Sequence, residues 1–471
     1  MKLLKGNFIQ TRQFFIIKFH VLSLLLGMVH CHASAQSLQD KLSAGWKTFY
    51  SDKQLNYATV SLTVFDKQTG KMVFGKNENL GLAPASTLKT VTSAVAFASL
   101  GQDFRFKTEL AYRGQIIGGV LKGDLIIHGS GDPTLGSSRF SGTSKVSVLQ
   151  KWLNAIKAAG IIKIEGRVIA DDAVWDSQNL PEGWIWEDMG NYYGASSNVL
   201  CWGENELEVN FITAMTGEQT AIKLPESYPF LQVFNEVKTG AAGSGDNVYG
   251  YTSPYSNVIW LRGTYGKDLR KTIRFALPDP ALALAYDLAG YLSSKGIPNA
   301  GYATSRSQAI REGGRHVIAT IQSPELTEII NQFNQKSINL YGEQLLRVMA
   351  VDPTASIKGG LEFVKDFWGQ RGVDKYSLNI GDGSGLSPAN RVTGKSMATI
   401  LAWASQQNWY DKYYQSLPTY NGMKMKSGTI GDVLAYAGYQ GNYCFAIMVN
   451  NYHGSSSAMR SKIFKMLDQL K

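Results

Sequence analysis

The sequence predicts a mixed α and β protein, in which one sheet flanked by helices is assembled from the two ends of the chain. Alternating apolar residues near the N-terminus indicate a β-hairpin, and two apolar runs near the C-terminus indicate paired strands, with helical patterns between them. Short strand-like runs and glycine-rich turns dominate the middle of the chain. We therefore predict a second, β-rich domain inserted into the first, and a third inserted into the second.

The first 35 residues have the order of a secretory signal peptide. Their only charged residues are basic, namely Lys2, Lys5, Arg12 and Lys18. An apolar run from Val21 to Val29 and the small residues Ala33-Ser34-Ala35 follow, which predicts cleavage after Ala35. Because the apolar run is too short for a membrane span, we expect an exported protein of the periplasm or cell envelope with no membrane span.

The net charge indicates what kind of partner the protein could bind, and the number of cysteines indicates whether disulfides hold the fold together. Removal of the predicted leader lowers the formal net charge from +10 to +6. This charge fits either attraction to an anionic envelope polymer or an ordinary solvated surface, and we expect no nucleic-acid partner. Cys201 and Cys444 would remain, too few for a disulfide framework. Cys444 lies in an apolar run and is expected to be a buried thiol.

A hairpin is predicted where four apolar residues alternate with polar ones, at Ala58, Val60, Leu62 and Val64. A turn at 67–70 and a return run from Met72 to Phe74 complete it. After Pro84, the stretch from Ser86 to Leu100 carries apolar residues at helical spacing and ends before Gly101, which predicts a buried helix.

Strands are also predicted near the C-terminus, at Val433 to Tyr439 and Tyr443 to Asn450, before a closing helix at 457–470. The clearest elements predicted in the middle are strands at Val120 to His128 and Ile164 to Ala170, and helices at Trp152 to Ala159 and Ala281 to Lys295.

Ser86-Thr87-Leu88-Lys89 is the candidate nucleophilic motif, since it is the one place where a serine stands three residues before a lysine. On a helix these positions share a face, so the Lys89 amine can approach the Ser86 hydroxyl. A serine needs a base of this kind because its hydroxyl is a poor nucleophile at neutral pH. A helix N-terminus also favours the developing negative charge. Alone, the motif is weak, because such spacing also arises by chance.

Two further motifs follow in an order that strengthens the first. Ser337-Ile338-Asn339 lies on a predicted helical stretch after Asn334, and Lys426-Ser427-Gly428-Thr429 precedes the paired strands. Ser337 can relay a proton to a leaving nitrogen, Asn339 can hold a substrate amide, and Lys426 supplies positive charge.

The third motif also offers contacts to a substrate. Gly428 lets a substrate backbone approach the strand, which a Cβ would obstruct. Thr429 can bind a carboxylate through its hydroxyl, and its N–H with that of Ser86 would form an oxyanion hole. Ser427 completes this candidate binding strand.

The sequence resembles the low-molecular-mass class C penicillin-binding proteins, the type-4 family, over nearly the whole mature chain. Besides the three motifs, the likeness rests on several stretches, namely Gly123-Asp124-Leu125, Gly129-Ser130-Gly131-Asp132-Pro133, Gly183-Trp184, Tyr192-Tyr193-Gly194-Ala195, Asp279-Pro280, Ser323-Pro324-Glu325-Leu326 and Asp382-Gly383-Ser384-Gly385-Leu386-Ser387.

This resemblance implies a penicillin-binding domain of the serine β-lactamase-like type, an antiparallel sheet flanked by helices, formed by residues 36–98 and 311–471. Insertions at 99–173 with 263–310, and at 174–262, are expected. The implied activity is that of a D-alanyl-D-alanine carboxypeptidase or endopeptidase acting on peptidoglycan stem peptides and acylated by β-lactams, without a metal or cofactor. The implied roles are Ser86 as nucleophile, Lys89 as general base, and the other two motifs as the rest of the site.

Two positions depart from the family pattern. Ser427 stands where threonine is usual, and Pro388 stands where several relatives carry a basic residue that helps to recognise the stem peptide. Asp132 either contacts a diamino acid of the stem peptide or only stabilises an Asx-type turn before proline.

Two other functions remain to be weighed. A serine β-lactamase would use the same nucleophile, but in those enzymes the first two motifs lie much closer than the 248 residues from Lys89 to Ser337. A non-catalytic envelope-binding protein would have no reason to keep all three motifs. The sequence leaves open the balance of carboxypeptidase and endopeptidase activity. Aromatic residues in the middle region fit either a glycan-binding surface or a core.

Overall fold

The computed structural model describes residues 38–311 and 313–471. The predicted signal peptide therefore lies outside the described residues. Within them, no helix is long and apolar enough to cross a membrane.

The two ends of the chain form one antiparallel sheet, as predicted. Its strand order is β19-β20-β21-β22-β1-β2, and β1 pairs with β22 along its full length. The strands are β1 (Thr59–Asp66), β2 (Met72–Lys76), β19 (Thr419–Tyr420), β20 (Met423–Ile430), β21 (Val433–Gln440) and β22 (Tyr443–Asn450). The predicted hairpin and the predicted C-terminal strands are confirmed.

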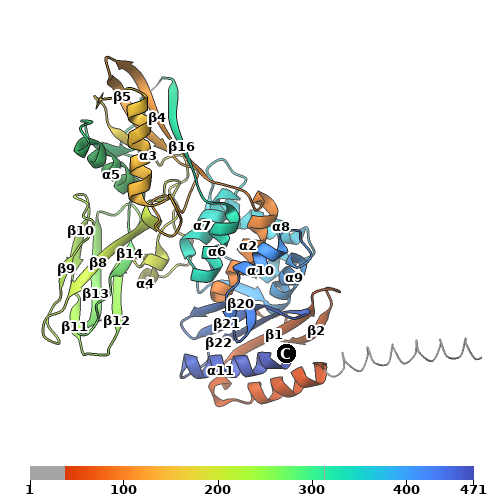
Figure 1. Ribbon diagram of the computed structural model, residues 1–471. Coiled ribbons are helices and arrows are strands. Elements are labelled where there is room, and N and C mark those ends of the chain that lie inside the picture. Colours follow the sequence, from red (N-terminus) through yellow and green to blue (C-terminus); the bar gives the residue numbers. More distant parts are fainter. Residues whose placement is uncertain (1–37, 312) are drawn as a thin grey trace, which may run out of the picture.

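Helices cover both faces of this sheet (Figure 1). A helix at 38–50 and α11 pack on one face, where Leu42 and Ile463 share a core with Val60. The other face packs against α2 and α9, which surround Ala446 and Tyr439. The helices of this part are α2 (Lys89–Leu100), α6 (Leu326–Lys336), α7 (Asn339–Val348), α8 (Ile357–Gly369), α9 (Gly394–Ala404), α10 (Tyr410–Ser416) and α11 (Ser456–Leu467).

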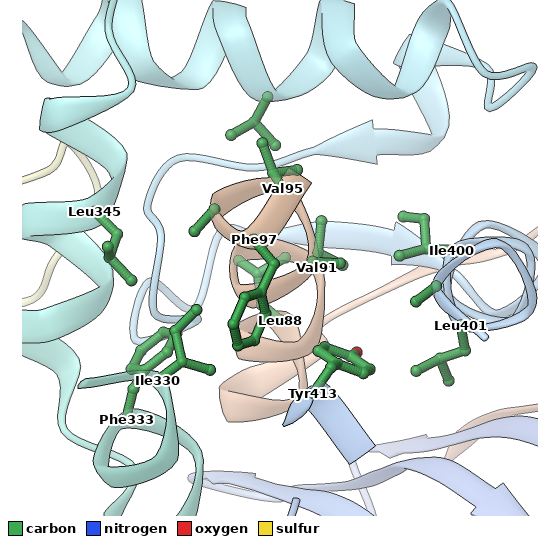
Figure 2. Packing of buried hydrophobic residues seen from close by; sticks show 14 of the residues in the cluster. Leu88, Val91, Val95, Phe97, Ile330, Phe333, Leu345, Ile400, Leu401 and Tyr413 are labelled. Atoms are coloured by element: carbon green, nitrogen blue, oxygen red, sulfur yellow. The ribbon is translucent and has the colours of Figure 1, made fainter. Parts of the chain in front are cut away.

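Helix α2 is the central helix of this part. Its residues 89–97 are all buried, and Figure 2 shows its apolar side chains among those of α6, α7, α9 and α10. Val91 and Val95 lie in one core cluster with Phe333 and Leu401. A helix surrounded in this way holds its first turn rigidly, because packed side chains leave little free volume. The predicted buried helix after Pro84 is confirmed.

A second sheet belongs to the middle of the chain. Its order is β15-β7-β5-β4-β16, with β6 beside β5, and helices α3 and α5 pack against it (Figure 1). These elements are β4 (Lys107–Ile117), β5 (Val120–His128), α3 (Lys145–Ala158), β6 (Lys163–Ile164), β7 (Val168–Asp171), α5 (Pro280–Ser294), β15 (Tyr302–Thr304) and β16 (Arg315–Gln322). Helix α3 begins earlier than predicted, because the Ser144 side chain caps it by accepting from the N–H of Ser147.

Two smaller sheets follow in the middle region, with orders β14-β8-β9 and β10-β13-β11, and β12 pairs with β13. Their elements are α4 (Trp186–Met189), β8 (Glu206–Ile212), β9 (Ala221–Lys223), β10 (Gln232–Asn235), β11 (Lys238–Gly240), β12 (Asp246–Tyr251), β13 (Val258–Gly266) and β14 (Ile273–Ala276). A last small sheet joins β17 (Leu378–Asn379), β18 (Arg391–Thr393) and β3 (Gly81–Leu82).

Two pairs of strands extend across predicted domain boundaries. Strand β16 pairs with β4, so the second sheet extends past residue 310, where the first domain was predicted to resume. Strand β14 pairs with β8, so the third β-rich unit extends past 262. Both differences have one cause, since the partner strands are far apart in sequence and their pairing leaves no local signal. The nested order of insertions itself stays a prediction.

Candidate active site

Ser86 lies where a short 3₁₀ helix, η2 (Ala85–Leu88), runs into α2. The preceding residue, Ala85, has a φ of 46°, a conformation that non-glycine residues rarely adopt. Strand β20 passes directly beside this turn. A Cβ on Gly428 would lie 2.6 Å from the Pro84 carbonyl oxygen and 2.9 Å from the Ser86 nitrogen. Glycine is therefore needed at 428 for the strand to approach the backbone of Ser86.

Lys89 makes three hydrogen bonds through its amine. The Nζ atom lies 3.0 Å from Ser86 Oγ, 2.6 Å from Asn339 Oδ1 and 2.7 Å from the Ser384 carbonyl oxygen. The side chain is fully buried. The amine is thus held against the Ser86 hydroxyl by partners from two other segments of the chain.

The environment favours the neutral form of this amine. Burial, and then the nearby positive charge of Lys426, lower the pKa of Lys89 well below its ordinary value, although Asp382 and Glu343 act in the opposite direction. An amine with a lowered pKa is available as a base near neutral pH. The predicted closeness of Lys89 to Ser86 is confirmed by the distance between them.

The second motif lies in a break between two helices, not on one helix as predicted. Ser337 ends α6 in the left-handed conformation, with φ 56° and ψ 40°, and Asn339 begins α7. The sharp turn leaves the Ser337 side chain on the wall of the cleft. Asn339 accepts from Lys89 and donates to the Tyr193 carbonyl oxygen at 2.8 Å, so it joins Lys89 to the middle region of the chain.

The third motif lies on β20, at the edge of the same cleft. Lys426 is only 2% exposed, and burial lowers its pKa to about 7. Its amine donates to the Ser427 carbonyl oxygen at 3.0 Å, while the Ser427 hydroxyl donates to Tyr420 Oη at 3.3 Å. Thr429 is exposed and lines the cleft. The three motifs therefore meet in one place.

A loop from Asp382 to Ser387 supplies the carbonyl that holds Lys89. The Asp382 carboxylate is fully buried. It accepts hydrogen bonds from the N–H groups of Gly385 and Ser387, from Asn390, and from the indole N–H of Trp184 at 2.9 Å. In the sequence this stretch entered only as part of the family resemblance, so the contact of this loop with Lys89 was missed.

Glu343 is a second buried carboxyl group near Lys89. It lies on α7, one turn after Asn339, and accepts from the N–H of Gly383 at 3.0 Å. Burial, and then the charge of Asp382, raise its pKa. A protonated Glu343 removes one negative charge from beside Lys89, which also favours the neutral amine.

The cleft has a volume of about 390 Å³. Ser86, Ser337, Asn339 and Thr429 line one part of it. The other walls come from the middle region, from the loop after Asp382 and from the end of β20, namely Ile185, Asp188, Tyr192, Tyr193, Gly385, Leu386, Pro388, Ile430 and Gly431. The first four of these had no predicted role, although Tyr192-Tyr193 had stood out as a sequence stretch.

Asp132 lies away from this cleft. Its carboxylate is buried and accepts from the N–H and the hydroxyl of Thr134, at 2.8 and 2.6 Å, which is the Asx-type turn. The preceding Gly131 carbonyl accepts from Gln344 on α7. Burial raises the pKa of Asp132 to about 6. The geometry supports the structural alternative for Asp132 and not the substrate contact.

One histidine and two cysteines lie outside the residues that line the cleft. His128 Nδ1 lies 3.0 Å from Asp171 Oδ2, which fits a structural role. Both Cys201 and Cys444 are buried free thiols, as expected for Cys444, and burial raises the pKa of each to about 12. Neither thiol is a reactive nucleophile at neutral pH.

Comparison with known proteins gives a consistent result. The profile of the D-Ala-D-Ala carboxypeptidase 3 (S13) family matches residues 42–470. A D-alanyl-D-alanine carboxypeptidase of an Actinomadura species is 27% identical over 449 residues, 86% of this chain and 80% of that protein. The D-alanyl-D-alanine carboxypeptidase DacB of Haemophilus influenzae is 27% identical over 341 residues, 70% of this chain and 67% of that protein.

Among solved structures, penicillin binding protein 4 of Haemophilus influenzae superposes with a TM-score of 0.75 at 23% identity, covering 90% of this chain and 97% of that chain. The likeness extends through the inserted region and confirms the predicted fold.

Proposed function

This chain belongs to the D-Ala-D-Ala carboxypeptidase 3 family, and from that premise we propose that it cleaves the D-alanyl-D-alanine bond of peptidoglycan stem peptides with Ser86 as nucleophile. The observation that carries this proposal is the contact between the Lys89 amine and Ser86 Oγ at 3.0 Å. Asn339 and the Ser384 carbonyl hold the same amine in place.

Acylation begins with proton transfer from the Ser86 hydroxyl to the neutral Lys89 amine. Ser86 Oγ forms a bond to the carbonyl carbon of the penultimate D-alanine, and the carbonyl oxygen becomes an oxyanion. The N–H groups of Ser86 and Thr429 would stabilise this oxyanion. Gly428 allows β20 to lie close to the turn that carries Ser86. This closeness supports the pairing of the Ser86 and Thr429 N–H groups.

Collapse of the oxyanion breaks the bond to the nitrogen of the terminal D-alanine. Ser337 relays to this nitrogen the proton that Lys89 took from Ser86, so D-alanine leaves and the Lys89 amine is neutral again. Lys426 and Thr429 hold the terminal carboxylate of the substrate, because they place a cation and a hydroxyl at the edge of the cleft. Water then attacks the ester on Ser86 while Lys89 accepts a proton from it. The bond between Ser86 Oγ and the acyl carbon breaks, Lys89 returns the proton to Oγ, and the shortened stem peptide leaves the free enzyme.

The far wall of the cleft suggests which side chain the stem peptide presents. Asp188 and Tyr193 lie together there, on the inserted region. Burial raises the pKa of Asp188, and pairing with an ammonium group would stabilise its charged form. We expect a diamino acid at the third stem position, contacted by Asp188 in place of Asp132. The proposal includes export, since peptidoglycan lies outside the cytoplasm.

β-Lactams should acylate the same serine. They present a carboxylate and a strained carbonyl, so they resemble the terminal carboxylate and the cleaved carbonyl group of the proposed substrate. The amine released by ring opening stays tethered, so it hinders the water that would hydrolyse the ester. A long-lived acyl-enzyme is therefore expected, in contrast to a β-lactamase.

Digestion of purified peptidoglycan, with mass analysis of the products, tests the proposed activity. Release of free D-alanine from stem peptides would support the carboxypeptidase, and conversion of cross-linked dimers to monomers would support the endopeptidase. Unchanged peptidoglycan, with folded protein, would contradict the proposal. The Ser86→Ala variant is the matched control, because it should release neither product.

A further inference from the structure

The middle region carries a band of exposed aromatic side chains, four on strands β10, β12 and β13 and two on the neighbouring segment 186–192. We define this aromatic band as six residues, listed in chain order: Trp186, Tyr192, Phe234, Tyr249, Tyr251 and Trp260. Five of them are among the large apolar side chains that stay exposed, from 36% for Trp260 to 52% for Tyr192. The sheet is mixed, since β10 and β11 pair with β13 in parallel and β12 pairs with it in antiparallel fashion. The solvent face of a sheet ordinarily carries polar side chains, so the band is unusual for an exposed face.

One pair of rings in the band is stacked, and a cation lies over two of the rings. Phe234 on β10 and Trp260 on β13 stack with centroids 4.4 Å apart and planes at 14°. The Arg262 guanidinium lies over the rings of Trp260 and Tyr251, at 5.5 and 5.6 Å. On the next strand, Tyr251 opposes Trp260 directly. These contacts fix the rings while leaving one face of the sheet open to a ligand.

The band is continuous with the candidate active site. The Tyr251 ring lies 5.7 Å from that of Trp186, which is the first residue of α4 and follows Ile185 in the wall of the cleft. Tyr192, another member of the band, lines the cleft itself. In Figure 1, α4 lies between the sheets of the inserted region and the helices of the first domain. A ligand on the band would therefore lead into the cleft.

We propose that the aromatic band binds the glycan strand of peptidoglycan while an attached stem peptide occupies the cleft. The proposal rests on the proposed function, which supplies a substrate joined covalently to sugar. Aromatic faces bind the apolar faces of pyranose rings, and polar neighbours bind the hydroxyl and acetamido groups. The same sheet face supplies such neighbours in Arg262 and Glu236, whose side chains are joined at 2.8 Å.

The charged pair also distinguishes a glycan from a lipid surface. Burial of the band in a bilayer would remove Arg262 and Glu236 from water, which is costly for charged groups. A hydrated glycan strand has polar as well as apolar faces, so it leaves both charged groups in contact with water and avoids this cost. The length of the stem peptide fits this arrangement as well. About three extended residues span roughly 10 Å, so a peptide bound in the cleft keeps its attached sugar near the rim of the cleft. Binding at two linked points raises the effective concentration of the peptide at Ser86.

The test uses peptide-free glycan strands, prepared by amidase digestion of peptidoglycan and labelled with a fluorophore. Binding to the full mature chain is measured by fluorescence anisotropy. The Phe234→Ala/Trp260→Ala double variant should bind at least about tenfold more weakly, a loss of about 1.4 kcal/mol. The Tyr57→Ala variant is the control, because this tyrosine is 79% exposed but lies outside the band. It should bind as the wild type does.

A second measurement separates this inference from the proposed function. Wild type and double variant should cleave a short peptide ending in D-alanyl-D-alanine at equal rates, while the variant should be slower on polymeric peptidoglycan. Equal glycan binding by the double variant would overturn the inference, even if the short peptide is cleaved. Loss of a dimer on substitution of the band, seen by sedimentation, would also overturn it in favour of self-association. Failure to cleave the short peptide, with glycan binding intact, would instead overturn the proposed function alone.

Discussion

The indole N–H of Trp184 donates a 2.9 Å hydrogen bond to the buried carboxylate of Asp382, across 198 residues of sequence. Trp184 belongs to the inserted region, and Asp382 begins the loop whose Ser384 carbonyl holds the Lys89 amine. The middle region is thus part of the support of Lys89, the proposed base. Asn339 makes a second connection of this kind, since it contacts both Lys89 and the Tyr193 carbonyl.

Trp184→Phe should weaken this support without removing any group that contacts substrate. The phenyl ring keeps most of the apolar contact but leaves Asp382 without one of its donors. The free energy of unfolding should fall by about 1–3 kcal/mol, measured by urea denaturation. The rate of acylation by penicillin should fall at the same time. Normal values of both quantities would show that the hydrogen bond has no role in positioning the loop.

Lys89→Arg should abolish the base while keeping a positive charge. A guanidinium group does not lose its proton in a protein at neutral pH, so it cannot accept one from Ser86. Acylation by a labelled penicillin should fall by about 10²–10⁴-fold, with circular dichroism unchanged. Lys358→Arg, on the exposed side of α8, is the matched control. Acylation at the normal rate in Lys89→Arg would assign the base to another residue.

The pH dependence of acylation should have an alkaline limit set by Lys426. Burial lowers the pKa of this lysine to about 7, so its amine loses its positive charge as the pH rises through that value. The second-order rate constant for penicillin should therefore fall above about pH 7, because the carboxylate loses its cationic partner. Lys426→Arg keeps the charge and should move this limit to higher pH. An unchanged profile in the variant would contradict the assignment.

Gly428→Ala should displace Ser86 without unfolding the protein. The new Cβ would lie 2.6 Å from the Pro84 carbonyl oxygen and 2.9 Å from the Ser86 nitrogen, so the strand and the turn must separate. A displacement of about 1 Å at a reacting atom costs roughly a hundredfold in rate. Gly290→Ala is the control, since a Cβ there meets no atom within 4 Å. Stopped-flow acylation should separate the two variants, and equal rates would show that the contact is relieved without displacement.

The parts of the fold and site that the sequence predicted are those encoded locally. The alternation at Val60, Leu62 and Val64 predicts a strand, and the spacing of Ser86 and Lys89 predicts a contact one helical turn apart. The order of the three motifs, read through the family resemblance, brings distant segments together. No local pattern predicts which side chains complete such a site.

The features that the sequence did not predict depend on contacts between distant segments or on the local path of the backbone. Asp382 looks like a turn residue until Trp184 and Asn390 are placed beside its carboxylate. Ser337 was expected on a helix, because its neighbours have helical spacing, but the chain turns there through a left-handed residue. The aromatic residues of the middle region divide between core and surface according to strand register, since Trp260 and Tyr265 lie on the same strand with opposite exposure.

The central claim is that Ser86 is the acylated nucleophile, and peptide mass mapping after brief exposure to penicillin tests it most directly. One penicillin should add per chain, on the fragment that contains Ser86, and the adduct should persist far longer than an acyl-enzyme formed from a peptide. The Ser86→Ala variant should remain unlabelled. An adduct on another residue, or rapid turnover of penicillin with no adduct, would contradict the account.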